Sequence, residues 1–287
     1  MKKLTFTLSA LIIGLGAIAQ TQASKPLAGT KIMLTKGQII EVVSEVTAES
    51  SLMPGMSVNN KTTSSSKLEV KEISENSFSL TSTTTHLKMD MDMMGQNTSY
   101  DSDKKEDQDS DIGKAMAGSL NVPENVTLDI FTGKEVKTNK ADDKLAAPGN
   151  NSNALTGIFA SAGSGGAAMA SNAFLVIPAN TPIGGSWTDS TGDKDNKSVR
   201  VFTLKSMDGN TATVSLQETS GGTTKIDYQG MEMQMSNTTK TTGDIISDIT
   251  TGRVSSRTTK SEISGSMQIM GQDMPITASA TTTTTYK

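Results

Sequence analysis

Methionines that alternate with charged residues offer the most distinctive chemistry in this sequence. Met89, Met91 and Met93 are separated by single aspartates, and the only histidine of the chain, His86, lies three residues upstream. Thioether sulfurs are soft ligands that suit Cu(I). The candidate copper ligands are Met89, Met91, Met93, Met94 and His86. On a strand, however, His86 would lie on the face opposite the three alternating methionines. The spacing therefore favours an apolar strand face over a copper site.

A second group of methionines has the same spacing. Met231, Met233 and Met235 alternate with polar residues in the last quarter of the chain. Side chains two residues apart on a strand point the same way, and each methionine contributes about 1.5–3 kcal/mol when it is fully buried. Methionine also adapts its shape to irregular partners. We expect both groups to line an apolar core or, as a hypothesis, a cavity for a hydrophobic small molecule or lipid.

The composition excludes several classes of site. The 287 residues include no Cys and one His, so disulfides, thiolate metal centres and sites with two imidazoles are excluded. The formal net charge of −4 at pH 7 argues against nucleic acid as a partner. Aromatic residues make up only 3% of the chain, which includes 40 Thr and 35 Ser.

Sequence motifs of common enzymes are missing as well. The chain contains no G-x-S-x-G nucleophile elbow, P-loop or dinucleotide-binding glycine motif. The acidic run at 101–111 does not fit a calcium loop, because the sixth position counted from Asp107 is Ile112 where a glycine is needed. We predict no catalytic residues, no enzymatic activity and no cofactor.

The first residues have the pattern of an export signal. Two lysines follow Met1, residues 4–19 are mostly apolar, and small residues precede the possible cleavage points after Ala19 and Ala23. A retained N-terminal anchor is the alternative, although the apolar stretch is short for a membrane span. With no Cys available, a lipoprotein anchor is excluded. We expect a Sec-type signal peptide at 1–19 and a secreted or periplasmic protein that is not integral to a membrane after cleavage.

The rest of the chain follows a period of two, which is typical of strands. We expect a first β-rich half at 20–110, an insert of short helices, loops and strands at 111–173, and a second β-rich half at 174–287. A short strand is expected at 31–34. Turns are expected at Lys36-Gly37, Glu75-Asn76, Asp208-Gly209-Asn210, Gly221-Gly222 and Thr251-Gly252.

An internal duplication is one reading of the two halves. The apolar positions of 70–80 align with those of 204–214 at a constant offset. The alternating methionines follow later in each half, at 89–93 and 231–235, but this second offset is larger than the first. Chance similarity in a biased composition is the alternative.

Four short motifs resemble an uncharacterised family of secreted bacterial proteins, a domain of unknown function. They are G-x-x-x-x-Y-D-S at 95–102, P-x-x-x-P-I-G-G-S-W at 178–187, F-T-L before D-G-N at 202–210, and D-x-x-T-G-R-V at 248–254. The family usually carries an acidic residue where this chain has Gly185, a difference that concerns a turn. The resemblance implies a β-rich secreted protein and brings no catalytic residues with it.

Together these observations predict a mainly β fold. We expect antiparallel sheets in two β-rich halves, curved or half-barrel-like, with a short helical insert. The predicted function is that of a non-enzymatic secreted or periplasmic envelope protein with a hydrophobic ligand in a Met-lined cavity. A periplasmic copper-binding protein and a structural or adhesive surface module are the alternatives. The sequence leaves the oligomeric state open.

Overall fold

Eleven strands form one antiparallel sheet in the structure, a computed structural model that describes residues 31–53, 56–93, 95–136, 166–192, 196–228, 231–269 and 272–287. The strands are β1 (Ile39–Met53), β2 (Met56–Ile73), β3 (Ser77–Met93), β4 (Gln96–Asp101), β5 (Glu124–Asp129), β6 (Ser186–Gly192), β7 (Asn196–Asp208), β8 (Thr211–Tyr228), β9 (Met231–Asp248), β10 (Val254–Ile269) and β11 (Gln272–Tyr286). The described residues also include three short helices, α1 (Lys105–Gln108), α2 (Asp111–Met116) and α4 (Gly166–Asn172). The expected mainly β, antiparallel fold with a short helical insert is confirmed. Within these ranges, no helix is long and apolar enough to cross a membrane.

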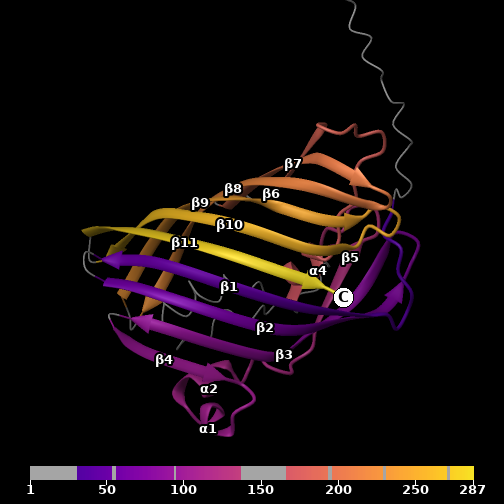
Figure 1. The fold of residues 1–287 in the computed structure, drawn as a ribbon. Helices are drawn as coiled ribbons and strands as arrows, with labels where there is room; N and C mark the ends of the chain where they lie inside the picture. The colour runs from indigo at the N-terminus through magenta and orange to yellow at the C-terminus, as the bar shows by residue number, and fades with distance from the viewer. Residues whose placement is uncertain are drawn as a thin grey trace, which may run out of the picture.

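The strand order places the first and last strands, β1 and β11, side by side. It runs β4-β3-β2-β1-β11-β10-β9-β8-β7-β6, and β5 pairs with the part of β3 that β4 leaves free. Strand β1 pairs with β11 from Val42, opposite Tyr286, to Ser51, opposite Thr277. Figure 1 shows the indigo and purple strands of the first half meeting the orange and yellow strands of the second at this pair. The sheet is one continuous surface that contains both halves.

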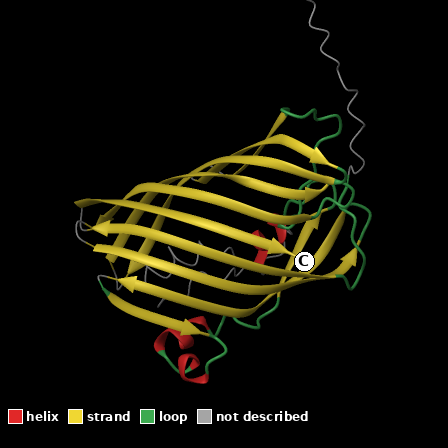
Figure 2. Cartoon of the chain, in the orientation of Figure 1, coloured by secondary structure: helices red, strands yellow, loops and turns green. Residues whose placement is uncertain are grey.

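The sheet curves, and its two faces differ. We call the face that carries the buried Ile40, Leu68 and Phe78 the inner face, and the opposite one the outer face. Figure 1 shows α4 on the inner side of the curve and α1 and α2 beyond the β4 edge. In Figure 2 many of the loops gather at the end of the sheet where the chain terminates. We call this end the closed end and the other the open end.

The closed end contains the hydrophobic core. Inner-face residues of nine strands pack there against Ile32, α4 and the segment that follows it; they include Ile40, Val42, Leu68, Val70, Phe78, Leu80, Val126, Leu128, Leu204, Val214, Leu216, Ile245, Val254 and Tyr286. The rings of Phe78 and Phe174 meet edge to face, with centroids 5.2 Å apart. Burial of each large side chain contributes about 1.5–3 kcal/mol, so this core stabilises the curved sheet.

Two hairpins of the halves have the same local geometry. In the first, the backbone N–H of Gly37 donates to Val70 at 2.8 Å; in the second, that of Gly184 donates to Leu204 at 2.7 Å. Both glycines have positive φ. The register shifts just after Val70 in β2 and just after Leu204 in β7. Because both the turn and the bulge recur, the structure supports the duplication at the offset that joins 70–80 to 204–214.

The same six-residue turn ends each duplicated unit. The sequence D-I-x-T-G followed by Lys or Arg occurs at 129–134, after β5, and at 248–253, after β9. In each turn the aspartate carboxylate accepts hydrogen bonds from the backbone N–H groups of the residues two and three positions later, and a glycine with positive φ closes the turn. In the first half, β5 pairs with β3. In the second half, the end of β9 pairs with β8 in the same way, so β5 corresponds to the end of β9.

The structure corrects three sequence expectations. Residues 31–34 are not a strand; Ile32 and Met33 each make one backbone hydrogen bond to a different turn, and Ile32 fills the core. Gly221-Gly222 is not a turn, since β8 continues through both residues and a Cβ on Gly221 would lie 3.3 Å from a carbonyl oxygen of the neighbouring strand. The methionine strands are not duplicated partners, because the equivalent of β3 is β8 while Met231 begins β9.

Candidate functional site

A bulge in β3 decides which face its methionines occupy. Ser66 of β2 pairs with Thr84, but the adjacent Ser65 pairs with His86, so Thr85 is the extra residue. The bulge shifts the alternation by one position, and Met89, Met91 and Met93 share the inner face with the core residues Phe78 and Leu80.

The three methionines form one wall of the open end. They lie opposite Thr62, Asn60 and Val58 of β2, respectively. Val58 and Asn60 are buried, whereas all three methionines keep part of their surface exposed. The Asn60 side chain accepts a hydrogen bond from the Thr62 hydroxyl at 3.2 Å, which satisfies a polar group on this wall. The wall is apolar and only partly covered.

The other sequence-predicted methionines fall outside what the structure describes. Met94 is outside the described residues, and for Met231, Met233 and Met235 only the backbone, within β9, is described. Among the described side chains, the structure therefore places only Met89, Met91 and Met93 together on one wall. For the second group the cavity hypothesis remains a prediction.

His86 lies on the opposite face from the methionines, beside two acidic residues. Its Nε2 lies 3.3 Å from Asp101 Oδ1 and 3.5 Å from Asp103 Oδ2. The Asp103 backbone N–H lowers the pKa of Asp101, and the hydrogen bond from His86 lowers it further, against the opposing effect of desolvation. The three side chains could hold a divalent cation, but this set has no thioether. Copper ligation by His86 together with Met89, Met91 and Met93 does not fit this arrangement.

A charged cluster on the inner face went unnoticed in the sequence. Arg257 of β10 lies at the border between the core and the open end, and its Nη1 donates to Asn172 Oδ1 of α4 at 2.6 Å. Arg200 of β7 pairs across the strands with Glu218 of β8, with 3.2 Å between Arg200 Nε and Glu218 Oε1. The Ser198 hydroxyl also donates to this carboxylate, at 2.7 Å.

Two more charges complete this cluster. Asp189 of β6 pairs with Arg200 in the sheet and forms an ion pair with Lys134. The sequence did hold a signal, since Arg200 is two residues from Phe202 and Glu218 is two residues from Leu216, and both apolar partners are buried on the inner face. For Arg257 no such signal exists, because a register shift at 254–256 separates it from Val254.

Burial shifts the acid–base properties of the cluster. Desolvation is the main cause that lowers the pKa of Arg257, and the nearby Arg200 cation lowers it further. Tyr286 and Glu218 act in the opposite direction and raise it. Burial raises the pKa of Tyr286 to about 12, although Arg257 counteracts the shift. At neutral pH Tyr286 is therefore a neutral phenol and Arg257 a cation.

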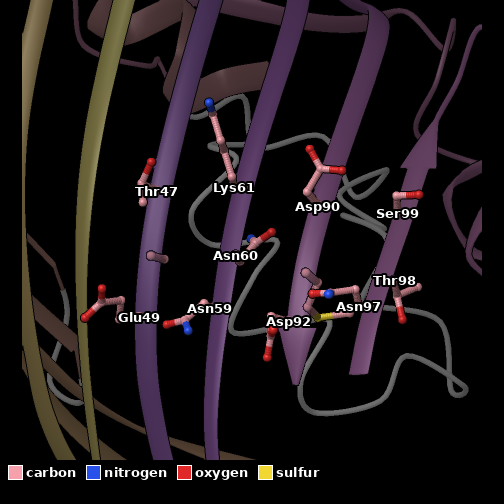
Figure 3. A pocket seen from close by; sticks show the side chains of 12 residues that line it. Thr47, Glu49, Asn59, Asn60, Lys61, Asp90, Asp92, Asn97, Thr98 and Ser99 are labelled. Carbon is pink, nitrogen blue, oxygen red and sulfur yellow. The ribbon is translucent and has the colours of Figure 1, made fainter. Parts of the chain in front are cut away.

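A hollow of about 330 Å³ extends over β1 to β4, and Met91 of the methionine wall is among its lining residues. Figure 3 shows its labelled side chains; apart from Asn60 and Thr98, they form two cross-strand rows. These rows are Thr47, Lys61, Asp90 and Ser99, and Glu49, Asn59, Asp92 and Asn97. By the strand alternation, both rows belong to the outer face. Three carboxylates and one lysine lie along these two rows, so the outer-face part of the lining is charged.

Comparisons with known proteins give distant structural likenesses only. No family model and no curated protein matches this chain. A solved structure concerned with lipid–protein interactions in lipovitellin matches 89% of this chain at 10% identity and a TM-score of 0.49, and the chain spans 25% of that lipovitellin chain. An outer membrane channel from Pseudomonas putida F1 matches 89% of this chain and 97% of its own at 7% identity and a TM-score of 0.25. Since both scores are low, the argument for a ligand rests on the side chains of this chain.

Proposed function

We propose that this protein is a non-enzymatic binding protein that holds a hydrophobic, lipid-like ligand on the inner face of its sheet. Its export signal and its resemblance to a secreted family support a secreted or periplasmic location, which belongs to the same proposal. The observation that carries the proposal is the partly covered wall of Met89, Met91 and Met93 on a concave sheet face.

The physical argument compares the two ends of the inner face. At the closed end, strand residues such as Leu80 and Val214 are fully buried by the packing of the protein on itself. At the open end, Met89, Met91 and Met93 keep exposed surface. A ligand that covered this surface would gain about 25 cal/mol for each Å² of apolar area removed from water. Methionine also adapts to ligands of irregular shape, which suits a hydrocarbon chain.

Native mass spectrometry of protein purified from its own host tests this proposal. We expect mass additions that correspond to bound lipid and that disappear on gentle activation. Met91→Asp places a carboxylate on the methionine wall and should abolish the additions, whereas Met91→Leu should keep them. Asp90→Asn changes the neighbouring outer-face residue, which is exposed, and is the matched control.

Other results would contradict the proposal. A clean ligand-free mass from the native host, together with no uptake of added lipid, would count against it. Cu(I) binding that is lost in Met89→Leu, Met91→Leu and Met93→Leu would favour the copper alternative instead. Melting temperatures of all variants within a few degrees of the wild type would show that the binding differences do not come from unfolding.

A further inference from the structure

The inner-face charges form a positive site between the core and the methionine wall. The cluster contains three cations, Arg257, Arg200 and Lys134, and two carboxylates, Asp189 and Glu218. Within this group of five, one positive charge remains. Glu124 of β5, opposite Ser82 and beside Gly166 at the start of α4, is a further inner-face carboxylate outside this group. A buried or half-buried charge is costly without a partner of opposite sign. The site therefore has the sign to attract an anion.

Tyr286 does not supply the missing negative charge. Its side chain is buried next to Arg257, and its raised pKa of about 12 keeps the phenol protonated at neutral pH. Asn172 offers Arg257 a neutral amide oxygen, which accepts a hydrogen bond but adds no charge. A guanidinium group carries five N–H donors in a planar fork, which matches the oxygens of a carboxylate or a phosphate.

Arg257 combines depth with access. Desolvation by the surrounding protein is the main cause of its lowered pKa, so the side chain lies deep within the structure. Its residue surface is nevertheless only half-buried. Arg257 lies on the inner face and keeps part of its surface open to solvent. The head group of a ligand can reach such a position.

Small side chains connect this site to the methionine wall. One cross-strand row on the inner face runs from Glu218 in β8 to Met91 in β3. Between them the row contains Thr241, Ser261, Ala280, Ala48 and Asn60. Along this row, Ser261 of β10 and Met91 of β3 are four strand spacings apart, about 19 Å, and Arg257 lies four residues from Ser261 on the same face of β10, about 13 Å along the strand. A hydrocarbon chain can lie over this row of small residues without displacing bulky side chains.

We propose that Arg257, assisted by Arg200, binds the anionic head group of an amphiphile whose hydrocarbon chain lies along this row toward Met91. The head group is a carboxylate or a phosphate, since both match the guanidinium fork. The assignment rests on the proposed ligand-binding function and specifies the class of ligand.

Amphiphiles with one chain and different head groups test the assignment. Binding of dodecanoate, dodecyl phosphate, dodecanol and dodecyltrimethylammonium to the full protein is measured by isothermal titration calorimetry. We expect one or both anions to bind about tenfold to a hundredfold more tightly than dodecanol, as for a charge-assisted hydrogen-bonded pair. The ratio between the two anions shows which head group the site prefers.

Variants of β10 separate the head-group site from the apolar wall. Arg257→Gln should reduce anion binding to the level of dodecanol while dodecanol binding is retained, and Arg257→Lys should restore part of the preference. Lys260→Gln removes an exposed cation from the outer face of the same strand and should change neither. Equal binding of dodecanoate and dodecanol by the wild type would overturn the head-group assignment alone. Failure of all four probes to bind would overturn the proposed function as well.

Discussion

At the level of single residues, the inner face combines apolar and charged side chains on one wall of a sheet. Tyr286 and Arg257 are neighbours at the border of the core. The phenol remains neutral because burial disfavours its charged form. Two residue-scale predictions follow from the pKa shifts in the structure, one on the inner face and one at the β4 edge.

Tyr286 should make stability depend on pH in the alkaline range. Its pKa is about 12 in the folded protein and near 10 in the unfolded chain. The protonated phenol therefore favours folding below pH 10, by about 2–3 kcal/mol, and this contribution is lost as the pH rises from 10 through 12. Urea midpoints compared with those of Tyr286→Phe check this: the wild type should lose stability relative to the variant across that range. Parallel curves would contradict it.

The carboxylate of Asp101 should respond to its histidine neighbour. Its pKa is lowered first by the Asp103 backbone N–H and then by His86. In His86→Ala the pKa of Asp101 should rise toward the ordinary value but stay below it, because the backbone donor remains. Titration of the carboxyl carbon by NMR measures this shift. An unchanged pKa would show that His86 does not interact with Asp101 in solution.

Residue-level prediction from the sequence succeeded where the alternation was uninterrupted. The opposite placement of His86 and the methionines follows from the parity of 86–93, and the bulge at Thr85 lies before this stretch. Arg257 could not be found in this way, because a second bulge, at 254–256, breaks the parity between it and the core residue Val254. Sequence parity alone does not locate bulges. The face of a residue that follows a bulge therefore cannot be predicted from the alternation.

At the level of elements, the repeated D-I-x-T-G turns close the ends of β5 and β9. In the second turn, burial alone would raise the pKa of Asp248, but the side-chain and backbone hydrogen bonds of Thr250 and Thr251 outweigh it and lower the pKa. The glycine of each turn packs against Ile32, and a Cβ on Gly252 would lie 3.3 Å from Ile32 Cγ1. Both turns pack against Ile32 and so stabilise the closed end of the sheet.

Removal of either turn aspartate should destabilise the protein. Asp248→Ala and Asp129→Ala should each lower the free energy of unfolding by about 1–3 kcal/mol, since several donors lose a charged acceptor. Because the pKa of Asp248 is lowered by folding, its contribution is present above pH 4 and is lost as the pH falls through the folded pKa. Urea unfolding at neutral and acidic pH tests both points.

The matched control for these variants is Asp208→Ala. Asp208 is an exposed aspartate of the β7–β8 hairpin at the same end of the sheet. Its replacement should change stability by less than about 0.5 kcal/mol. A loss as large as that of Asp248→Ala would show that the turn hydrogen bonds are not the cause.

At the level of the whole molecule, the pairing of β1 with β11 joins the two halves into one curved sheet. The sequence predicted antiparallel strands and curvature, because alternation and Thr-rich composition are local properties. It could not predict this pair, because Val42 and Tyr286 lie at opposite ends of the chain and no local pattern connects them. The charged cluster depends on the same assembly, since Arg257, Arg200 and Asn172 come from distant segments.

A proline at this junction should destabilise the whole sheet. Thr282 lies in β11 between β1 and β10, so Thr282→Pro removes a ladder donor inside the sheet. We expect a loss of about 1–3 kcal/mol or more in the free energy of unfolding. Thr98→Pro in the edge strand β4 should cost less, because β4 has a single neighbour. Equal losses in urea unfolding would contradict a sheet that is continuous across β1 and β11.

Fluorescence of the single tryptophan tests the central claim most directly. Trp187 lies on β6, stacked on the inner-face residue Phe202 with ring centroids 5.4 Å apart, two residues from Asp189 of the charged cluster. A fatty acid that carries bromine beside its carboxylate, bound with its head group at Arg257 and Arg200, should quench this fluorescence saturably, because Arg200 is two residues from the Trp187 partner Phe202. Met91→Asp should remove the saturable part. Quenching that rises linearly, equally in the wild type and in Met91→Asp, would contradict a ligand site on the inner face.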